Sequence, residues 1–425
     1  MRAADQTDPR FGAGSFVVTK APKFVDPGPV GPNVWDLARH GHGFVGVLAD
    51  LSSRQNVFGL VRYRHNGSLD RSFGGGGFTR PLQLNVGTQA QGVAVDARGR
   101  IVVAGFTHRF RPIPLLARFR RTGSLDRSFG KGGIVNLRHL RKGGGAVHDV
   151  VVEPGGRIVV AGTISENGIG ENGIRSGGFV AAYRPNGEVD RSFGKAGRAH
   201  FDLPRPNSDY SGLKSLELLR DGRILVSGFE DGKLFLARLL ADGRLDSSFG
   251  GGDGRVAVFT GNHTYGCYDL CWNAAPVAVR ADGKILALSA DFPDLAVIYR
   301  FRADGTLDRG FGDRGRVRVH RKGVWLQAFD LALQRGRIVV SGFDQVKHGK
   351  AKLSFCVLRF HADGRVDRRF GHNGAVIRSR NEFSGAYALL PQSRGRLLVG
   401  GGGQDRAKGA RWSRSVLLLS RYLPG

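Results

Sequence analysis

Leu69-Asp70-Arg71-Ser72-Phe73-Gly74 is the stretch that decides the fold, because close copies of it recur along the whole chain. The copies occupy residues 125–130, 189–194, 245–250, 307–312 and 366–371, and a degenerate copy occupies residues 8–12. Successive Asp residues of this signature are 56 to 64 positions apart. A unit of nearly constant size is therefore repeated, and seven signatures predict seven units.

Each unit contains the same four short apolar segments. In the second unit, residues 92–96 precede a turn that contains Gly99, and residues 101–105 form a β-branched run typical of a strand buried on both faces. Residues 115–120 form a third segment, and the signature leads into a fourth at 133–137. The glycine in the first turn suits a hairpin that needs a positive φ. This order predicts four antiparallel strands per unit.

Seven four-stranded units of this size predict an all-β protein with a single seven-bladed β-propeller domain over residues 1–425. The last unit lacks a fourth strand, whereas the chain begins with an isolated one, so we expect the N-terminal strand to join the last blade and close the ring. The predicted blades span residues 34–80, 88–137, 146–202, 211–259, 272–320, 325–379, and 384–425 plus 8–20.

The Leu-Asp-x-x-Phe-Gly-x-x-Gly phrase follows an Arg-Phe or Arg-Tyr strand and an Asp-Gly or Asn-Gly turn, and it resembles the delta-60 repeat of bacterial proteins. The segment from Val93 to Gly105 also resembles the NHL class of propeller repeats. The resemblance covers nearly the whole chain. It implies a propeller, often on an exported or cell-surface protein, and it implies no single activity.

The chain carries a formal charge of +28, with 64 Lys and Arg residues. The Arg residues recur at fixed places in each repeat, as Arg62 and Arg71 do in the first full signature. Repetition therefore distributes them instead of gathering them in one patch. We favour a solvated surface on which many Arg residues pair with Asp over a nucleic-acid site. A surface that binds a polyanion is the alternative.

The signature Asp has a structural and a catalytic interpretation. A residue present in every blade is expected to cap the turn or to pair with the Arg eight positions earlier, as Arg62 would pair with Asp70. We expect the signature Phe to fill the space between blades. Function should then be sought where the repeats differ.

Three carboxylates stand at equivalent positions before the expected innermost strands, namely Asp36, Asp149 and Asp330. They could hold a divalent cation such as Ca²⁺ or Mg²⁺, or act with His148 as catalytic acid and base. Alternatively, each Asp satisfies backbone groups at its own strand entry. Both interpretations are retained.

Candidate binding residues come from the same strand entries and from the loops that vary between blades. They are Trp35, Glu166, Asn167, Glu171, Asn172, Trp272, Tyr387 and Trp412. Cys267 and Cys271 beside Trp272 could be free thiols or a disulfide, and Cys356 in an apolar run is expected to be a core residue.

No Gly-x-Ser-x-Gly, P-loop or His-Glu-x-x-His motif is present. We therefore expect a non-catalytic, monomeric binding propeller for a protein, glycan or anionic polymer, without a nucleic-acid partner. The alternative is a metal-assisted hydrolase or lyase, similar in placement to lactonase-like and streptogramin-lyase-like propellers. No apolar run is long enough to span a membrane. We expect a secreted or cell-surface protein, or otherwise a cytoplasmic one, since no signal peptide is apparent.

Overall fold

The computed structural model describes most of the chain. The described residues are 6–12, 16–22, 33–49, 57–82, 84, 87–107, 112–140, 144–165, 176–203, 211–230, 233–259, 275–289, 296–319, 324–346, 353–379, 384–405 and 414–424. Within them the regular secondary structure is almost entirely β-strand, and the two helices are single 3₁₀ turns, η1 (Arg138–Leu140) and η2 (Ser393–Gly395). No helix in these ranges is long and apolar enough to cross a membrane.

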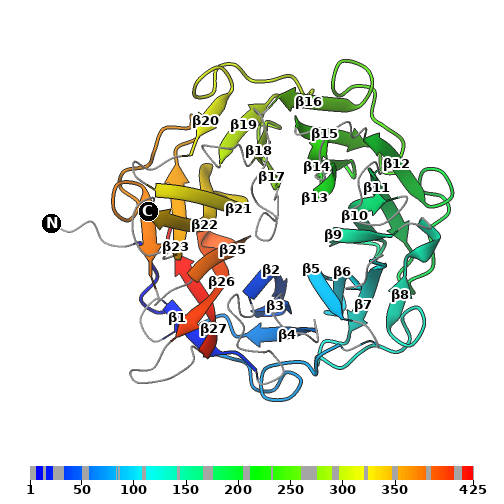
Figure 1. The fold of residues 1–425 in the computed structure, drawn as a ribbon, viewed down its shortest axis with the longest axis horizontal. Helices are drawn as coiled ribbons and strands as arrows, with labels where there is room; N and C mark the ends of the chain where they lie inside the picture. Colours follow the sequence, from blue (N-terminus) through cyan, green and yellow to red (C-terminus); the bar gives the residue numbers. More distant parts are fainter. Residues whose placement is uncertain are drawn as a thin grey trace. The chain divides into compact units, whose positions relative to one another are not determined.

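The strands form seven sheets, which we number as blades 1 to 7 in chain order (Figure 1). Blade 1 consists of β2 (Asn33–His40), β3 (Gly43–Ala49) and β4 (Phe58–Tyr63). Blade 2 consists of β5 (Thr88–Val95), β6 (Ile101–Thr107), β7 (Pro114–Phe119) and β8 (Ile134–Asn136). Blade 3 consists of β9 (Gly145–Val152), β10 (Ile158–Ser165), β11 (Ser176–Tyr183) and β12 (Arg198–Leu203). Blade 4 consists of β13 (Gly212–Leu218), β14 (Ile224–Glu230), β15 (Lys233–Leu239) and β16 (Arg255–Phe259).

The remaining blades follow the same order. Blade 5 consists of β17 (Val277–Val279), β18 (Ile285–Ser289), β19 (Val297–Phe301) and β20 (Arg316–Arg318). Blade 6 consists of β21 (Val324–Gln334), β22 (Arg337–Val346), β23 (Leu353–Phe360) and β24 (Ala375–Arg378). Blade 7 consists of β25 (Ser384–Pro391), β26 (Leu397–Asp405), β27 (Arg414–Tyr422) and β1 (Phe16–Lys20).

The fold is therefore a seven-bladed β-propeller with four antiparallel strands per blade, as the repeat predicted. Blade 1 departs slightly from the pattern. Among the residues described here, its fourth strand consists of two isolated bridges, Val61 with Phe78 and Phe58 with Leu82, so its regular sheet has three strands.

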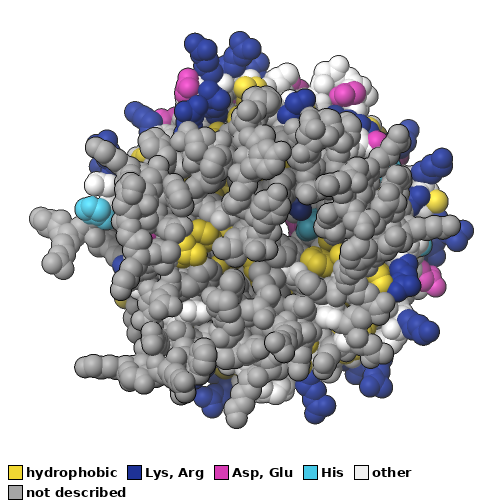
Figure 2. Space-filling view, in the orientation of Figure 1, with side chains coloured by type: hydrophobic (Ala, Val, Ile, Leu, Met, Phe, Trp, Pro, Cys, Tyr) yellow, Lys and Arg dark blue, Asp and Glu magenta, His cyan; other side chains and the backbone are white. Residues whose placement is uncertain are grey.

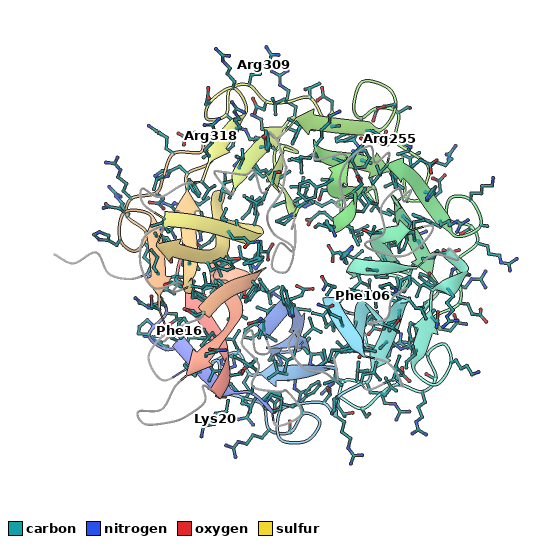
Figure 3. The ribbon with its side chains drawn as sticks, in the orientation of Figure 1. Phe16, Lys20, Phe106, Arg255, Arg309 and Arg318 are labelled. Carbon is teal, nitrogen blue, oxygen red and sulfur yellow. The ribbon has the colours of Figure 1, made fainter. Side chains whose placement is uncertain are left out.

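The N-terminal strand completes blade 7, which confirms the second prediction. β1 pairs antiparallel with β27, in a register that places Phe16 opposite Ser420 and Lys20 opposite Val416. In Figure 1, β1 is drawn in blue and lies beside β27 in red. Figure 3 labels Phe16 and Lys20, the two end residues of β1. Strand pairing removes an open sheet edge.

The chain divides into two compact units. Unit 1 comprises Met1–Gln83, Pro293–Ile298 and Arg309–Gly425, and unit 2 comprises Leu84–Phe292 and Tyr299–Asp308. Blades 6, 7 and 1 lie in unit 1, and blades 2, 3 and 4 lie in unit 2. Within each unit the core lies between neighbouring blades, for example around Phe179 between blades 2 and 3 and around Phe235 between blades 3 and 4.

The signature side chains connect one blade to the next. In blade 2, Asp126 Oδ1 accepts hydrogen bonds from the backbone N–H and hydroxyl of Ser128, and Asp126 Oδ2 accepts one from Arg118 Nε at 2.8 Å. The Arg118 guanidinium covers the ring of Phe129 at 4.5 Å and also donates to the Pro185 carbonyl of blade 3. Turn capping, Arg pairing and packing between blades were all predicted for the signature.

Five other blades repeat this Arg–Asp pair with separations of 2.7 to 2.9 Å. The pairs are Arg62–Asp70, Arg238–Asp246, Arg300–Asp308, Arg359–Asp367 and Arg421–Asp8. Because both partners are largely buried in most blades, each pair must also satisfy its hydrogen bonds to offset the cost of desolvation.

Blade 3 uses a different arginine. Ala182 occupies the place of the paired Arg, and Arg157 from the first turn of the blade replaces it. Arg157 lies 3.8 Å from Asp190, 5.7 Å from the Phe193 ring centroid and donates to the Ala241 carbonyl of blade 4 at 2.8 Å. The contact between blades is thus preserved with a cation from the turn before β10.

Candidate functional site

The first strand of six blades contains a β-bulge at an equivalent position. In blade 3 the register between β9 and β10 shifts between Ala161 and Gly162, and His148 is the extra residue. The corresponding extra residues are Trp35, Gln91, Lys214, Phe329 and Tyr387. A bulge redirects its side chain away from the regular alternation of the strand. The frame recurs, but the bulged residue differs in every blade.

A glycine in the second strand makes room for each of five bulges. At Gly162 an added Cβ would overlap the carbonyl oxygen of Ala146, and at Gly228 it would overlap that of Gly212. At Gly105, Gly342 and Gly401 an added Cβ would likewise overlap a backbone carbonyl oxygen in the first strand of the same blade. These glycines permit the close backbone approach that the bulge requires.

The Asp that follows the bulge binds backbone groups of two blades. Asp149 Oδ1 accepts from Val150 N–H at 2.7 Å, and Asp149 Oδ2 accepts from Leu216 N–H of blade 4 at 2.8 Å. Asp330 repeats this arrangement with Leu331 and with Leu389 of blade 7, both at 2.7 Å. Backbone satisfaction, one of the two interpretations of these carboxylates, is directly visible here.

Asp36 shows the first half of the same pattern, because its Oδ1 accepts from Leu37 N–H at 2.7 Å. Among the described residues, no group of three or more His, Cys, Asp and Glu side chains is arranged to hold a metal ion. The role of Asp36, Asp149 and Asp330 in cation binding stays a prediction.

Unit 2 holds a cluster of titratable side chains on β9 and β13. Lys214 Nζ lies 3.3 Å from His148 Nε2, and Ser215 Oγ donates to Asp149 Oδ2 at 3.3 Å. Burial, together with the charge of Lys214, lowers the pKa of His148 well below its usual range. The imidazole is therefore neutral near pH 7, and its Nε2 can accept a hydrogen bond from the Lys214 ammonium.

Two carboxyl groups of this cluster have raised pKa values. Burial raises the pKa of Asp149 to about 6, against the effect of its backbone hydrogen bonds. Burial and the nearby charge of Asp149 raise the pKa of Glu217 to about 7. Groups that titrate near neutral pH are characteristic of functional sites, although structural networks perturb pKa values too.

Unit 1 holds an aromatic cluster at the same strand positions. The ring centroid of Tyr387 lies 4.8 Å from that of Trp35 and 4.7 Å from that of Phe329. Phe343 packs on Phe329 at 5.5 Å. Phe329 and Tyr387 are buried, whereas Trp35 is only partly buried and presents surface for contact.

Six of the predicted site residues are thus described, and all six are bulged residues or the Asp residues that follow them. Glu166, Asn167, Glu171, Asn172, Trp272 and Trp412 lie outside the described residues, as do Cys267 and Cys271. Cys356 is a buried core residue, as expected. Lys214, Glu217 and Gln91 were missed, although the alignment of Lys214 with His148 in the repeat was a usable signal.

The comparisons with known proteins agree with the fold. A family model described as a domain of unknown function (DUF5122) beta-propeller matches residues 219–249, which run from the first turn of blade 4 to its signature. This match supports a β-propeller repeat protein, and the closer resemblance to the delta-60 repeat stays a prediction. No curated protein matches the chain significantly.

Solved structures with a similar fold have low sequence identity to the chain. A protein of unknown function from Bacteroides caccae is 14% identical, with a TM-score of 0.40 and coverage of 78% of this chain and 98% of that chain. A protein from Lactobacillus plantarum is 12% identical, with a TM-score of 0.41 and coverage of 88% and 94%. Polysaccharide lyase Uly1 is 8% identical, with a TM-score of 0.45 and coverage of 94% and 91%. These likenesses are too distant to transfer a function.

Proposed function

We propose that this protein is a non-catalytic binding propeller whose ligand contacts the bulged residues of the first strands. One observation carries the proposal. The bulge, the glycine opposite it and, in three blades, the following Asp recur as a frame, while the bulged side chain changes from blade to blade. Structural devices follow the symmetry of a repeat, whereas ligand contacts break it.

The chemistry of the bulged residues favours a glycan as the ligand. Partly buried Trp35 in unit 1 offers an aromatic face on which the C–H face of a sugar ring can pack. In unit 2, the Lys214 ammonium and the His148 imidazole offer a hydrogen-bonding pair suited to hydroxyl or carboxylate groups. We propose these as two contact sets, one in each unit.

The test is calorimetric titration with neutral and uronic-acid oligosaccharides. We expect Trp35→Ala to weaken binding through the aromatic set and Lys214→Met to weaken binding of the acidic sugars in particular. Arg309→Ala serves as the control, because Arg309 is exposed and extends away from the ribbon (Figure 3). Unchanged affinity in both variants would refute the proposal.

A second candidate function is hydrolysis or elimination, favoured by the pKa values of two carboxyl groups. Asp149 with a pKa of about 6 and Glu217 with a pKa of about 7 titrate in the range that suits general acid and base catalysis. Asp149 would have to perform this role while both of its oxygens accept backbone hydrogen bonds. Backbone binding therefore favours the non-catalytic proposal.

Titration with Ca²⁺, Mg²⁺, Mn²⁺ and Zn²⁺, followed by turnover assays on lactones, esters and uronic-acid glycans, distinguishes the two functions. Turnover that Glu217→Gln abolishes, while the variant remains folded at the pH of the assay, would replace the binding proposal with the enzyme. A cation site that Asp149→Ala removes would support the metal-assisted form.

A further inference from the structure

A cavity of about 380 Å³ lies between blades 2 and 3, within unit 2 and away from the bulged residues. Its lining includes Arg98, Arg100 and Arg118 from blade 2 and Gly155 and Asn186 from blade 3. The volume suits a small molecule. Three features distinguish this junction from the corresponding parts of blades 4 and 5, and all three increase positive charge or open space.

The first feature is the orientation of Arg100. In blades 4, 5 and 6 the cation at this position contacts the signature Asp, in the pairs Arg223–Asp246, Lys284–Asp308 and Arg337–Asp367 at 3.0 to 3.1 Å. Arg100 instead donates from Nε to Asp96 at 2.6 Å. Within the described part of the chain, the two terminal nitrogens of Arg100 have no hydrogen-bond partner.

The second feature is a local reversal of charge. Arg98 stands at the turn position that Asp221 occupies in blade 4 and Asp282 in blade 5, where each carboxylate pairs with an Arg of its own turn. The Arg98 side chain is exposed, and only its backbone N–H has a hydrogen-bond partner among the described residues, Asp96 at 2.9 Å.

The third feature is the missing side chain at Gly155, which is the residue of blade 3 at the same turn position. An added Cβ at Gly155 would meet no atom within 4 Å, so the position is open space in the cavity wall. Asn186, also in the cavity lining, accepts a hydrogen bond from the Glu188 backbone N–H through Oδ1, which leaves its amide nitrogen as a donor.

The electrostatics of the junction favour an added negative charge. Burial and the positive charge of Arg100 lower the pKa of Arg118, because the two guanidinium groups lie close together with only partial compensation from Asp126 and Asp96. An oxyanion in the cavity would relieve this repulsion. Guanidinium groups bind carboxylates and phosphates through paired N–H donors.

We propose that this cavity binds a small molecule through a phosphate or carboxylate group, held by Arg98, the terminal nitrogens of Arg100 and the Asn186 amide. The site is independent of the proposed function, since it shares no residue with the bulged positions. Its occupant would link blades 2 and 3 at the turn edge of the propeller, where the signature Arg118 also connects them.

The experiment is calorimetric titration of the full chain at low salt with inorganic phosphate, citrate and glucose 6-phosphate. Gly155→Asp places a carboxylate in the cavity wall without a steric clash, and Arg98→Glu reverses the charge at its mouth. We expect each variant to weaken binding by on the order of tenfold or more. Binding of citrate alone would assign a carboxylate ligand, and binding of the two phosphates alone a phosphorylated one.

The controls carry the same changes of charge elsewhere. Gly75→Asp adds a carboxylate at another open glycine, and Arg309→Glu reverses an exposed signature arginine. We expect both controls to bind like the wild type. Absence of binding by all three probes at millimolar concentration, or equal weakening in variants and controls, would overturn the proposal.

Discussion

Arg421 and Asp8 are 413 positions apart in the sequence, yet two nitrogens of the Arg421 guanidinium contact the Asp8 carboxylate, Nε at 2.9 Å and Nη2 at 2.7 Å. Phe11 lies under the same guanidinium at 4.6 Å, and Arg421 Nη1 donates to the His65 carbonyl of the turn in blade 1 at 2.6 Å. The degenerate first signature is therefore the signature of blade 7, supplied from the opposite end of the chain.

This pair should contribute substantially to stability. Asp8→Asn leaves the buried Arg421 without its counter-charge, so we expect the free energy of unfolding to fall by about 3 kcal/mol. Denaturant unfolding measures the change. Arg10→Ala, at an exposed position two residues later, is the control and should have little effect. A loss of the same size in both variants would mean that the N-terminal segment, and not the pair, is the source.

Blade 3 should depend on its substitute arginine. Arg157→Met removes the bond to Ala241, the contact with Phe193 and the cation nearest Asp190, so we expect a loss of about 2 kcal/mol. Arg223→Met in blade 4 should cost less, because Arg238 keeps Asp246 paired there. Thermal unfolding of the two variants compares them. Equal losses would show that Arg157 has no special role.

The carboxyl group of Glu217 should make stability depend on pH. Its pKa is about 7 in the folded state, raised from an ordinary value of about 4.5, so the folded state holds a proton that the unfolded state releases. The resulting stabilisation is complete below pH 4.5 and is lost as the pH rises to about 7. The glutamine in Glu217→Gln cannot titrate. Between pH 5 and pH 8 we therefore expect the free energy of unfolding of this variant to fall by about 1–3 kcal/mol less than that of the wild type.

Melting temperatures of the wild type and Glu217→Gln across this pH range test the prediction. Glu188→Gln is a suitable comparison, since Glu188 is an exposed carboxylate of the same unit. Parallel pH profiles for all three proteins would show that Glu217 titrates normally.

The glycines opposite the bulges should control the bulged side chains. Gly228→Ala forces its Cβ against the Gly212 carbonyl, so we expect the bulge at Lys214 to shift and stability to fall by about 2–4 kcal/mol. Gly155→Ala, at an open position, should be nearly neutral. Unfolding measurements compare stability, and ligand titration reports on Lys214. A neutral Gly228→Ala would contradict the geometric argument.

The architecture could be predicted from the sequence because each signature combines local and long-range information. The Asp and Gly of the signature specify a turn, and the constant spacing shows that the turns belong to equivalent sheets. The unpaired segments at the two ends then required β1 to join blade 7. Blade 1 was less predictable, because its fourth strand is too irregular to appear as more than two bridges.

The candidate site could be predicted only in part. Trp35, His148 and Tyr387 were identified from their places before the expected strands, but a bulge is a relation between two strands and has no signal in one strand alone. Lys214 and Glu217 are not marked by an Asp, because blade 4 has Ser215 at the position that Asp36, Asp149 and Asp330 occupy in their blades. The substitution of Arg157 for the absent arginine at position 182 likewise depends on packing between blades.

The pairing of β1 with β27 affects the order of events during synthesis. Residues 16–20 leave the ribosome roughly 400 residues before their partners at 416–420. Residues 6–12, which complete the signature of blade 7, also need β27, because Asp8 pairs with Arg421 of that strand. The nascent chain therefore carries an unpaired strand while all the intervening blades are synthesised, a period in which such a strand is available to chaperones or to neighbouring copies. Only a chain translated through Tyr422 can satisfy it.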